Sequence, residues 1–192
     1  MADIQKMPKG AGKSSFELID PKILAETLPI KPGSVVLDLA CGKGTYSTFL
    51  SEIVGEQGLV YAVDMWQEGL LLLDQEIENR NITNIMTILG DATKNFGVDE
   101  YHIDLCLMST VLHDFEEANQ TDAVLKQVKP LLKPNGCLAV IEFKKIEGPP
   151  GPPIKIRLSE NEVNKIVTGY NFRKIKTVEV GNFNYMMTFQ SI

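Results

Sequence analysis

The chain has 192 residues, of which 44% are hydrophobic, and its formal net charge is −6 at pH 7. This length and composition fit a single domain over residues 1–192, and the negative charge disfavours a broad nucleic-acid or anionic-membrane footprint. No apolar run reaches the ~20 residues of a membrane span and residues 1–4 begin no signal peptide, so we expect a cytoplasmic protein that does not enter a membrane.

Metal-binding and redox chemistry have little support in the sequence. The three cysteines, Cys41, Cys106 and Cys137, show no C-x-x-C spacing, and each lies in or beside an expected strand. No cluster of His, Cys, Asp or Glu has the spacing of metal ligands. We therefore expect buried, reduced thiols and no metal site.

Residues 1–30 precede the first expected strand and are predicted to form a lid or a helical extension. Gly10 and Gly12 supply mobility ahead of an aromatic and aliphatic cluster that starts at Phe16. Phe16 is a candidate substrate contact. The alternative is a frayed terminus followed by a helix that only packs on the domain.

Residues 35–44 contain a buried strand that runs through Asp38 and Ala40 into a turn with Gly42 and Gly44. The apolar residues after this turn have helical spacing, so the helix amides would face a bound ligand. The pattern indicates a nucleotide-type cofactor site, with a purely structural strand-to-helix turn as the alternative. A dinucleotide site would favour a third glycine where this chain has Ser47, which disfavours an NAD-dependent oxidoreductase.

Acidic residues also end the next two expected strands. Residues 59–63 lead into Asp64, whose carboxylate can accept hydrogen bonds from both ribose hydroxyls or can instead cap a helix. Met65 and Trp66 follow and offer an apolar surface for an adenine. Residues 85–89 lead into Gly90, Asp91 and Ala92, a sequence that is also typical of a simple turn.

Residues 104–108 form the fourth expected strand, and Ser109 and His113 follow it. His113 is the candidate proton acceptor and substrate ligand because histidine titrates near neutral pH, although a packed or solvated histidine is the alternative. Asp114 opens a D-x-x-E capping box, which predicts a helix from there to Leu132. A fifth strand at 137–141 ends at Glu142, which is either a second acid or base or a solvated carboxylate.

The C-terminal part begins with a stiff Gly/Pro connector at 148–157, and its Arg157 either binds an anionic substrate or pairs with a surface acid. Ser159 and Glu162 form a capping box ahead of another helix. Two extended runs at 172–180 and 183–189 are joined only by Gly181 and Asn182, which requires an antiparallel pair. The alternation of strands and helices predicts an α/β fold with a mostly parallel sheet between two helical layers.

The pattern from Asp38 through Gly42 to Gly44 closely resembles motif I of the class I S-adenosylmethionine-dependent methyltransferases. The Gly-Pro-Pro segment, Arg157 and the Leu-Ser-x-x-Glu-Val run resemble the small methyltransferase-domain 11/25 type, which is similar to the quinone-biosynthesis C-methyltransferases. The resemblance implies a Rossmann-like three-layer sandwich with strand order 3-2-1-4-5-7-6 and strand 7 antiparallel. It further implies that S-adenosyl-L-methionine is held by Asp38, Ala40, Gly42, Gly44, Asp64, Met65, Trp66, Asp91, Ala92 and Ser109.

The resemblance also implies the chemistry. It predicts in-line transfer of the sulfonium methyl group to a small-molecule acceptor, yielding S-adenosylhomocysteine, by a monomer or a homodimer that acts on neither nucleic acid nor membranes. His113 is the expected catalytic residue. The expected substrate contacts are Phe16, His113, Glu142 and Arg157. Motif I is also similar to that of arsenite methyltransferases, but no cysteine lies in the C-terminal substrate region, so arsenic chemistry is not expected. The alternatives are a noncatalytic cofactor-binding or regulatory protein of the same fold and an NAD-dependent oxidoreductase.

Overall fold

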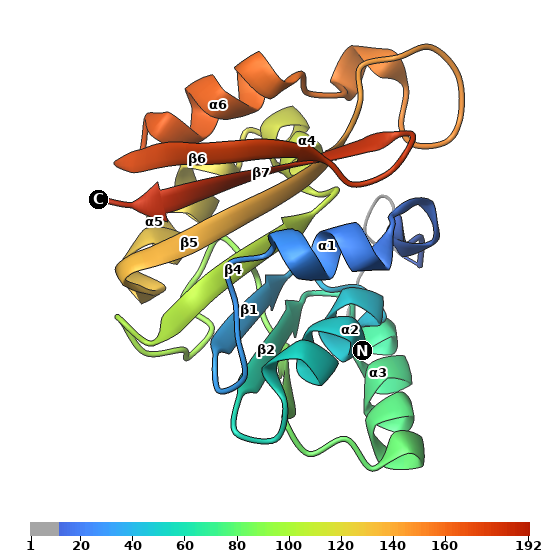
Figure 1. Ribbon diagram of the computed structural model, residues 1–192, viewed down its shortest axis with the longest axis vertical. Helices are drawn as coiled ribbons and strands as arrows, with labels where there is room; N and C mark the ends of the chain where they lie inside the picture. Colours follow the sequence, from blue (N-terminus) through green and yellow to red (C-terminus); the bar gives the residue numbers. More distant parts are fainter. Residues whose placement is uncertain (1–11) are drawn as a thin grey trace, which may run out of the picture.

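A seven-stranded sheet with the order β3-β2-β1-β4-β5-β7-β6 forms the centre of the structure, a computed structural model that describes residues 12–192 (Figure 1). The strands are β1 (Val35–Leu39), β2 (Leu59–Asp64), β3 (Ile85–Leu89), β4 (Ile103–Ser109), β5 (Leu132–Phe143), β6 (Phe172–Glu179) and β7 (Asn184–Ser191). The α-helices are α1 (Pro21–Thr27), α2 (Thr45–Val54), α3 (Gln67–Arg80), α4 (Leu112–Glu117), α5 (Thr121–Leu131) and α6 (Glu160–Thr168). Two short 3-10 helices, η1 (Phe16–Leu18) and η2 (Ile154–Ile156), complete the described elements.

The sheet has the predicted topology. Neighbours among β1 to β5 pair in parallel, whereas β7 pairs antiparallel with both β5 and β6. The β6–β7 hairpin places β7 between β5 and β6, which gives the predicted order 3-2-1-4-5-7-6 and confirms the fold class. The capping box at α6 is also confirmed, because the Ser159 and Glu162 side chains bond reciprocally to the backbone at the start of this helix.

Apolar residues on the two faces of the sheet build two separate parts of the core. On one face, α1 and α2 bury Leu24 and Leu50 against Val36 and Leu107. On the other face, α4, α5 and α6 bury side chains against the sheet; Leu112, Val128 and Val163 are examples. Both faces of β1 and β4 are therefore covered, which explains their nearly continuous apolar sequences.

Two predicted details are wrong. Asp114 does not begin a helix, because it lies inside α4, whose N-cap is Val111. The single helix predicted from 114 to 132 is two helices, α4 and α5, and the chain turns between them at Asn119, which has a φ of 56°. The fifth strand is longer than predicted: β5 begins at Leu132, and its pairing with β4 jumps from Leu132 to Cys137, so residues 133–136 bulge from the ladder.

The order of the sheet reverses between β1 and β4, because β2 and β3 lie on one side of β1 while β5, β7 and β6 lie beyond β4. The carboxyl ends of parallel strands at such a reversal form the usual crevice for ligands in open α/β sheets. Within residues 12–192, no helix has the length and apolar character needed to cross a membrane.

Candidate active site

The loop after β1 adopts a left-handed backbone conformation at three alternate residues. Ala40, Gly42 and Gly44 all have positive φ values, of 59°, 60° and 75°. A side-chain carbon at Gly44 would lie 2.4 Å from a methyl carbon of Leu73, whereas one at Gly42 would meet no atom within 4 Å. Gly44 is therefore required for packing between this loop and α3, and Gly42 borders open space where a ligand can approach the backbone.

Asp38 lies beneath this loop and is fully buried. Its Oδ2 accepts a hydrogen bond from Ser47 Oγ at 2.6 Å, while Oδ1 has no partner among the described residues. Burial raises the pKa of Asp38 from 3.8 to about 7; the Ser47 hydrogen bond opposes this rise and the nearby charge of Asp64 adds to it. An unpartnered buried carboxylate oxygen is costly unless a donor reaches it, which suits a ligand with an N–H or ammonium group.

Asp64 ties the β1 loop to the start of α3. Its Oδ2 accepts from the backbone amide of Gly42 at 2.7 Å, and its Oδ1 accepts from the amide of Trp66, also at 2.7 Å. Gly69 allows this close packing, because a side-chain carbon there would lie 2.3 Å from the Trp66 ring. Each carboxylate oxygen has a second lone pair, so ribose binding remains compatible with both contacts.

The predicted adenine side is more open. Asp91 Oδ1 accepts from the amide and the hydroxyl of Thr93 at 2.9 and 2.6 Å, and Oδ2 lies 3.0 Å from Lys94 Nζ. These Thr93 hydrogen bonds, followed by the Lys94 contact, lower the pKa of Asp91. Met65 is 45% exposed and is available to a ligand. The adenine contacts of Asp91 and Ala92 stay predictions.

A narrow cleft of about 40 Å³ lies over the β1 loop and is lined by Ala40, Gly42 and Ser109 together with residues 13–15. Ser15 holds this segment in place: its Oγ is 2.9 Å from Tyr46 Oη and 3.2 Å from Thr110 Oγ1. Thr110 directly follows β4 and has a φ of 51°, which is strained for a β-branched residue.

A larger cavity of about 520 Å³ adjoins this cleft, because Lys13, Ser14, Ser15 and Thr110 line both. The polar residues of the cavity wall are Lys13, Ser14, Ser15, Thr110, His113 and Asp114. The remainder of its lining is mostly apolar and comprises Leu18, Phe143, Pro150, Gly151, Pro152, Pro153 and Ile156.

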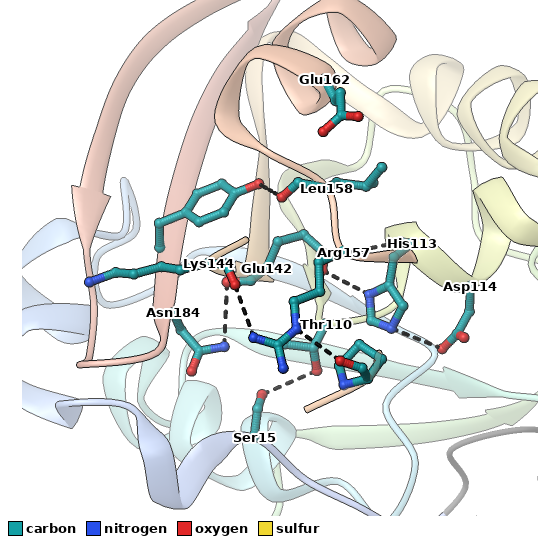
Figure 2. A network of polar contacts seen from close by, with 12 residues as sticks. Ser15, Thr110, His113, Asp114, Glu142, Lys144, Arg157, Leu158, Glu162 and Asn184 are labelled. Atoms are coloured by element: carbon teal, nitrogen blue, oxygen red, sulfur yellow. Dashed lines mark hydrogen bonds and ion pairs between the residues drawn. The ribbon is translucent and has the colours of Figure 1, made fainter. Parts of the chain in front are cut away.

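His113 lines this cavity and also contacts Glu142 in the protein interior (Figure 2). Its Nδ1 lies 2.8 Å from Glu142 Oε2, and its backbone amide donates to Glu142 Oε1 at 3.0 Å. The Nε2 atom lies 3.6 Å from Asp114 Oδ2. Burial alone lowers the pKa of His113, but the hydrogen bond and charge of Glu142, together with Asp114 and Glu117, raise it overall.

Three of the predicted substrate residues have different surroundings from those expected. Phe16 packs edge-on against Tyr46 at a centroid distance of 5.1 Å and is not part of the cavity lining. Glu142 is fully buried and both of its oxygens contact His113, so it supports the histidine from the interior. Arg157 is only 2% exposed, and its guanidinium donates to five backbone carbonyl oxygens. Because a guanidinium has five N–H donors, none is left for an anionic substrate, and that prediction is wrong.

Sequence reasoning missed Ser15, Thr110 and Phe143. Ser15 and Thr110 are 95 positions apart in the chain, and a threonine does not by itself predict a left-handed backbone. Phe143 lies just beyond the strand expected at 137–141, and nothing in the sequence marked it as part of a site. The Gly-x-Gly-x-x-Ser spacing did contain a usable signal for Ser47, whose hydroxyl lies one helical turn beyond the glycine loop.

The methyltransferase domain family matches residues 30–189. The chain belongs to this family. The crystal structure of a SAM-dependent methyltransferase from Aquifex aeolicus has a TM-score of 0.84 and 29% identity, and the match covers 97% of each chain. The methyltransferase assignment made from motif I is thereby confirmed, and neither alternative function gains support.

The curated relatives differ in the acceptors that their names imply. Demethylmenaquinone methyltransferase of Lactobacillus johnsonii is 28% identical over 159 residues, which are 83% of this chain and 61% of the relative. Fibrillarin-like rRNA/tRNA 2'-O-methyltransferase of Thermococcus onnurineus is 36% identical over 108 residues, covering 56% of this chain and 46% of the relative. The methyltransferase domain thus spans about six tenths or less of the length of these curated relatives.

Proposed function

We propose that this methyltransferase-domain protein transfers the methyl group of S-adenosyl-L-methionine to a small-molecule acceptor bound in the 520 Å³ cavity. The observation that carries the proposal is the position of His113. This histidine lines the cavity, is held from behind by the buried Glu142, and lies three residues after Thr110, which borders both the cavity and the cofactor cleft.

The β1 loop at the cleft, together with Asp38 beneath it and residues 64–66 beside it, fits the proposed cofactor. The unpartnered Asp38 Oδ1 suits a ligand ammonium group, and the open space at Gly42 allows close approach to the loop backbone. Asp64 would accept from the ribose hydroxyls, and Met65 and Trp66 would contact the adenine. When bound, the cofactor supplies an electrophilic methyl carbon on a sulfonium whose leaving group is a neutral thioether.

His113 would take the proton that the acceptor loses. A carboxylate oxygen can only accept, so the 2.8 Å contact with Glu142 favours a proton on Nδ1 and leaves Nε2 as the basic atom. The raised pKa of His113 makes its imidazole a stronger base than an isolated histidine. Removal of this proton by His113 would leave the acceptor with the electron pair needed to receive the methyl group.

The cavity favours a small, partly apolar acceptor. Four of its polar residues, Lys13, Ser14, Ser15 and Thr110, also line the cofactor cleft, whereas Phe143, the proline-rich segment and Ile156 form most of the remaining wall. An acceptor with one polar group on an apolar body would satisfy both parts. The demethylmenaquinone methyltransferase relative is consistent with such a compound.

The predicted N-terminal lid is part of the same proposal. The cleft of about 40 Å³ holds only a few water molecules, so residues 13–15 would have to move before a cofactor could enter. The contacts of Ser15 with Tyr46 and Thr110 would then close this segment over the bound cofactor. Residues 1–11 of the predicted lid lie outside the described residues.

The test is a metabolite-extract screen with methyl-labelled S-adenosylmethionine, combined with calorimetric titration of S-adenosylhomocysteine and NAD. We expect binding of S-adenosylhomocysteine, little response to NAD, and label in a small organic compound. A protein that binds the cofactor but labels nothing would support the noncatalytic alternative. Because fibrillarin-like relatives are named for rRNA and tRNA, labelled tRNA with no labelled small molecule would contradict the proposed acceptor class.

A further inference from the structure

Residues 144–153 fold around the guanidinium of Arg157. Five N–H groups of this side chain donate to backbone carbonyl oxygens, and the acceptors belong to alternate residues of the segment. The acceptors and their distances are Lys144 at 3.1 Å, Ile146 at 2.8 Å, Gly148 at 2.6 Å, Pro150 at 2.8 Å and Pro152 at 2.8 Å. Arg157 therefore fixes the path of the segment over nine consecutive residues, 144–152.

The composition of this segment explains why it needs an outside donor. Prolines at 149, 150, 152 and 153 have no N–H, so the segment has few amides with which to bond its own carbonyl groups. A guanidinium presents five donors in one rigid plane, a geometry that lysine with three donors on a flexible chain does not reproduce.

The same segment forms one wall of the acceptor cavity. Pro150 and Pro152 both line the cavity and both accept from Arg157. Gly151, between them, packs so closely on Phe143 that a side-chain carbon there would lie 2.6 Å from the ring. The Phe143 ring also lines the cavity, and its centroid is 5.7 Å from Arg157 Cζ (Figure 2 shows the Arg157 side chain). Arg157 thus contacts three parts of the cavity wall without lining the cavity itself.

We propose that Arg157 is a positioning residue for the acceptor: it holds the wall formed by Phe143 and residues 150–152 and so determines which acceptor shapes fit. This inference rests on the proposed function, because it takes the 520 Å³ cavity as the acceptor site. The cofactor cleft shares none of these residues, so Arg157 affects binding of the acceptor and not binding of the cofactor.

The first test measures amide hydrogen exchange by mass spectrometry in Arg157→Lys. We expect exchange in residues 144–156 to become at least about tenfold faster, while exchange in the strands stays unchanged. The matched control is Arg80→Lys, because Arg80 is exposed on α3 and pairs with Glu52 and Glu76, away from the cavity lining. Affinity for S-adenosylhomocysteine should stay within about twofold in both variants.

The second test follows methyl transfer from labelled S-adenosylmethionine to a dilution series of metabolite extract. For Arg157→Lys, we expect the half-saturating amount of extract to rise at least about fivefold while the plateau rate changes little, which indicates lost acceptor binding. For Arg157→Ala, added methylguanidinium should restore both the exchange protection of 144–156 and the half-saturating amount. Ethylammonium, which lacks the planar set of donors, should not.

Several results would overturn the inference: unchanged exchange at 144–156, an unshifted half-saturating amount despite faster exchange there, or exchange that rises throughout the chain and is not restored by methylguanidinium. A different result would contradict the proposed function instead. If the wild-type protein binds S-adenosylhomocysteine but methylates nothing in any extract, exchange and methylguanidinium rescue still decide whether Arg157 sets the cavity wall.

Discussion

Substituting Asp38 by Asn should make the free protein more stable at alkaline pH while weakening the cofactor site. Asp38 is fully buried, and within residues 12–192 its carboxylate accepts a side-chain hydrogen bond only from the Ser47 hydroxyl. Asparagine has almost the same shape and keeps an oxygen for Ser47, but it carries no charge. The variant therefore removes the one pH-dependent term at this position, the desolvation of a buried carboxylate.

The magnitude follows from the pKa of Asp38, which burial raises from 3.8 to about 7. A group whose pKa is higher in the folded state contributes stability that is complete below its unfolded pKa and is lost as pH rises through the folded pKa. For this shift the loss reaches roughly 4 kcal/mol at full titration, as an upper bound, and roughly 2.5 kcal/mol of it falls between about pH 5 and pH 8. The asparagine N–H₂ has no evident acceptor and costs about 1–3 kcal/mol, but that cost does not depend on pH.

The assay is urea unfolding of the wild type and Asp38→Asn at about pH 5 and about pH 8. Between them, the difference in unfolding free energy between the two chains should move in favour of the variant by roughly 2.5 kcal/mol. Asp122→Asn is the control, because Asp122 is an exposed residue whose pKa is lowered by Lys126, and it should give no such gain. Affinity for S-adenosylmethionine should fall in Asp38→Asn. Parallel pH dependence in the two chains would refute the reasoning.

Four further predictions concern the site. Asp64→Ala should lose roughly 1.5–3 kcal/mol of cofactor affinity, measured by calorimetry, and Asp64→Asn should lose less because it keeps one acceptor; unchanged affinity in a folded Ala variant would leave only the loop contacts as its role. His113→Ala should lower single-turnover methyl transfer by roughly 10²–10⁴-fold with cofactor affinity intact, whereas a comparable loss of affinity would argue against a role as base. Wild-type transfer should rise with pH through a midpoint above 6.5, and Glu142→Gln should move that midpoint to lower pH by removing the carboxylate that raises the pKa of His113; a flat profile would exclude this base. Gly44→Ala should lose about 2 kcal/mol or more of stability, because its new methyl group meets a buried leucine of α3, while Gly42→Ala should lose less stability and more cofactor affinity. The reverse ranking of the two variants would contradict the assignment of open space at Gly42.

The sequence by itself determined most of the elements, the acids at the ends of the first three strands and the family. Continuous apolar runs at β1, β2 and β4 predict strands covered on both faces. Once β1, β2 and β3 are located, Asp38, Asp64 and Asp91 are found at or near their carboxyl ends. The hairpin at Gly181 and the capping box at Ser159 are also readable, because each depends on residues that are close together in the chain. The family resemblance then implied the strand order, which the structure confirms.

Only the tertiary structure decided what the functional side chains contact. His113 and Glu142 are 29 positions apart and meet because β4 and β5 are neighbours, and Ser15 reaches Thr110 across 95 positions. In the sequence Arg157 is compatible with binding an anionic substrate or pairing with a surface acid, yet its partners are carbonyl oxygens that only the folded path of 144–152 brings together. The physical reason is the range of each interaction: periodicity, caps and turns depend on neighbours within about one turn, whereas burial and side-chain pairing depend on which strands lie next to each other.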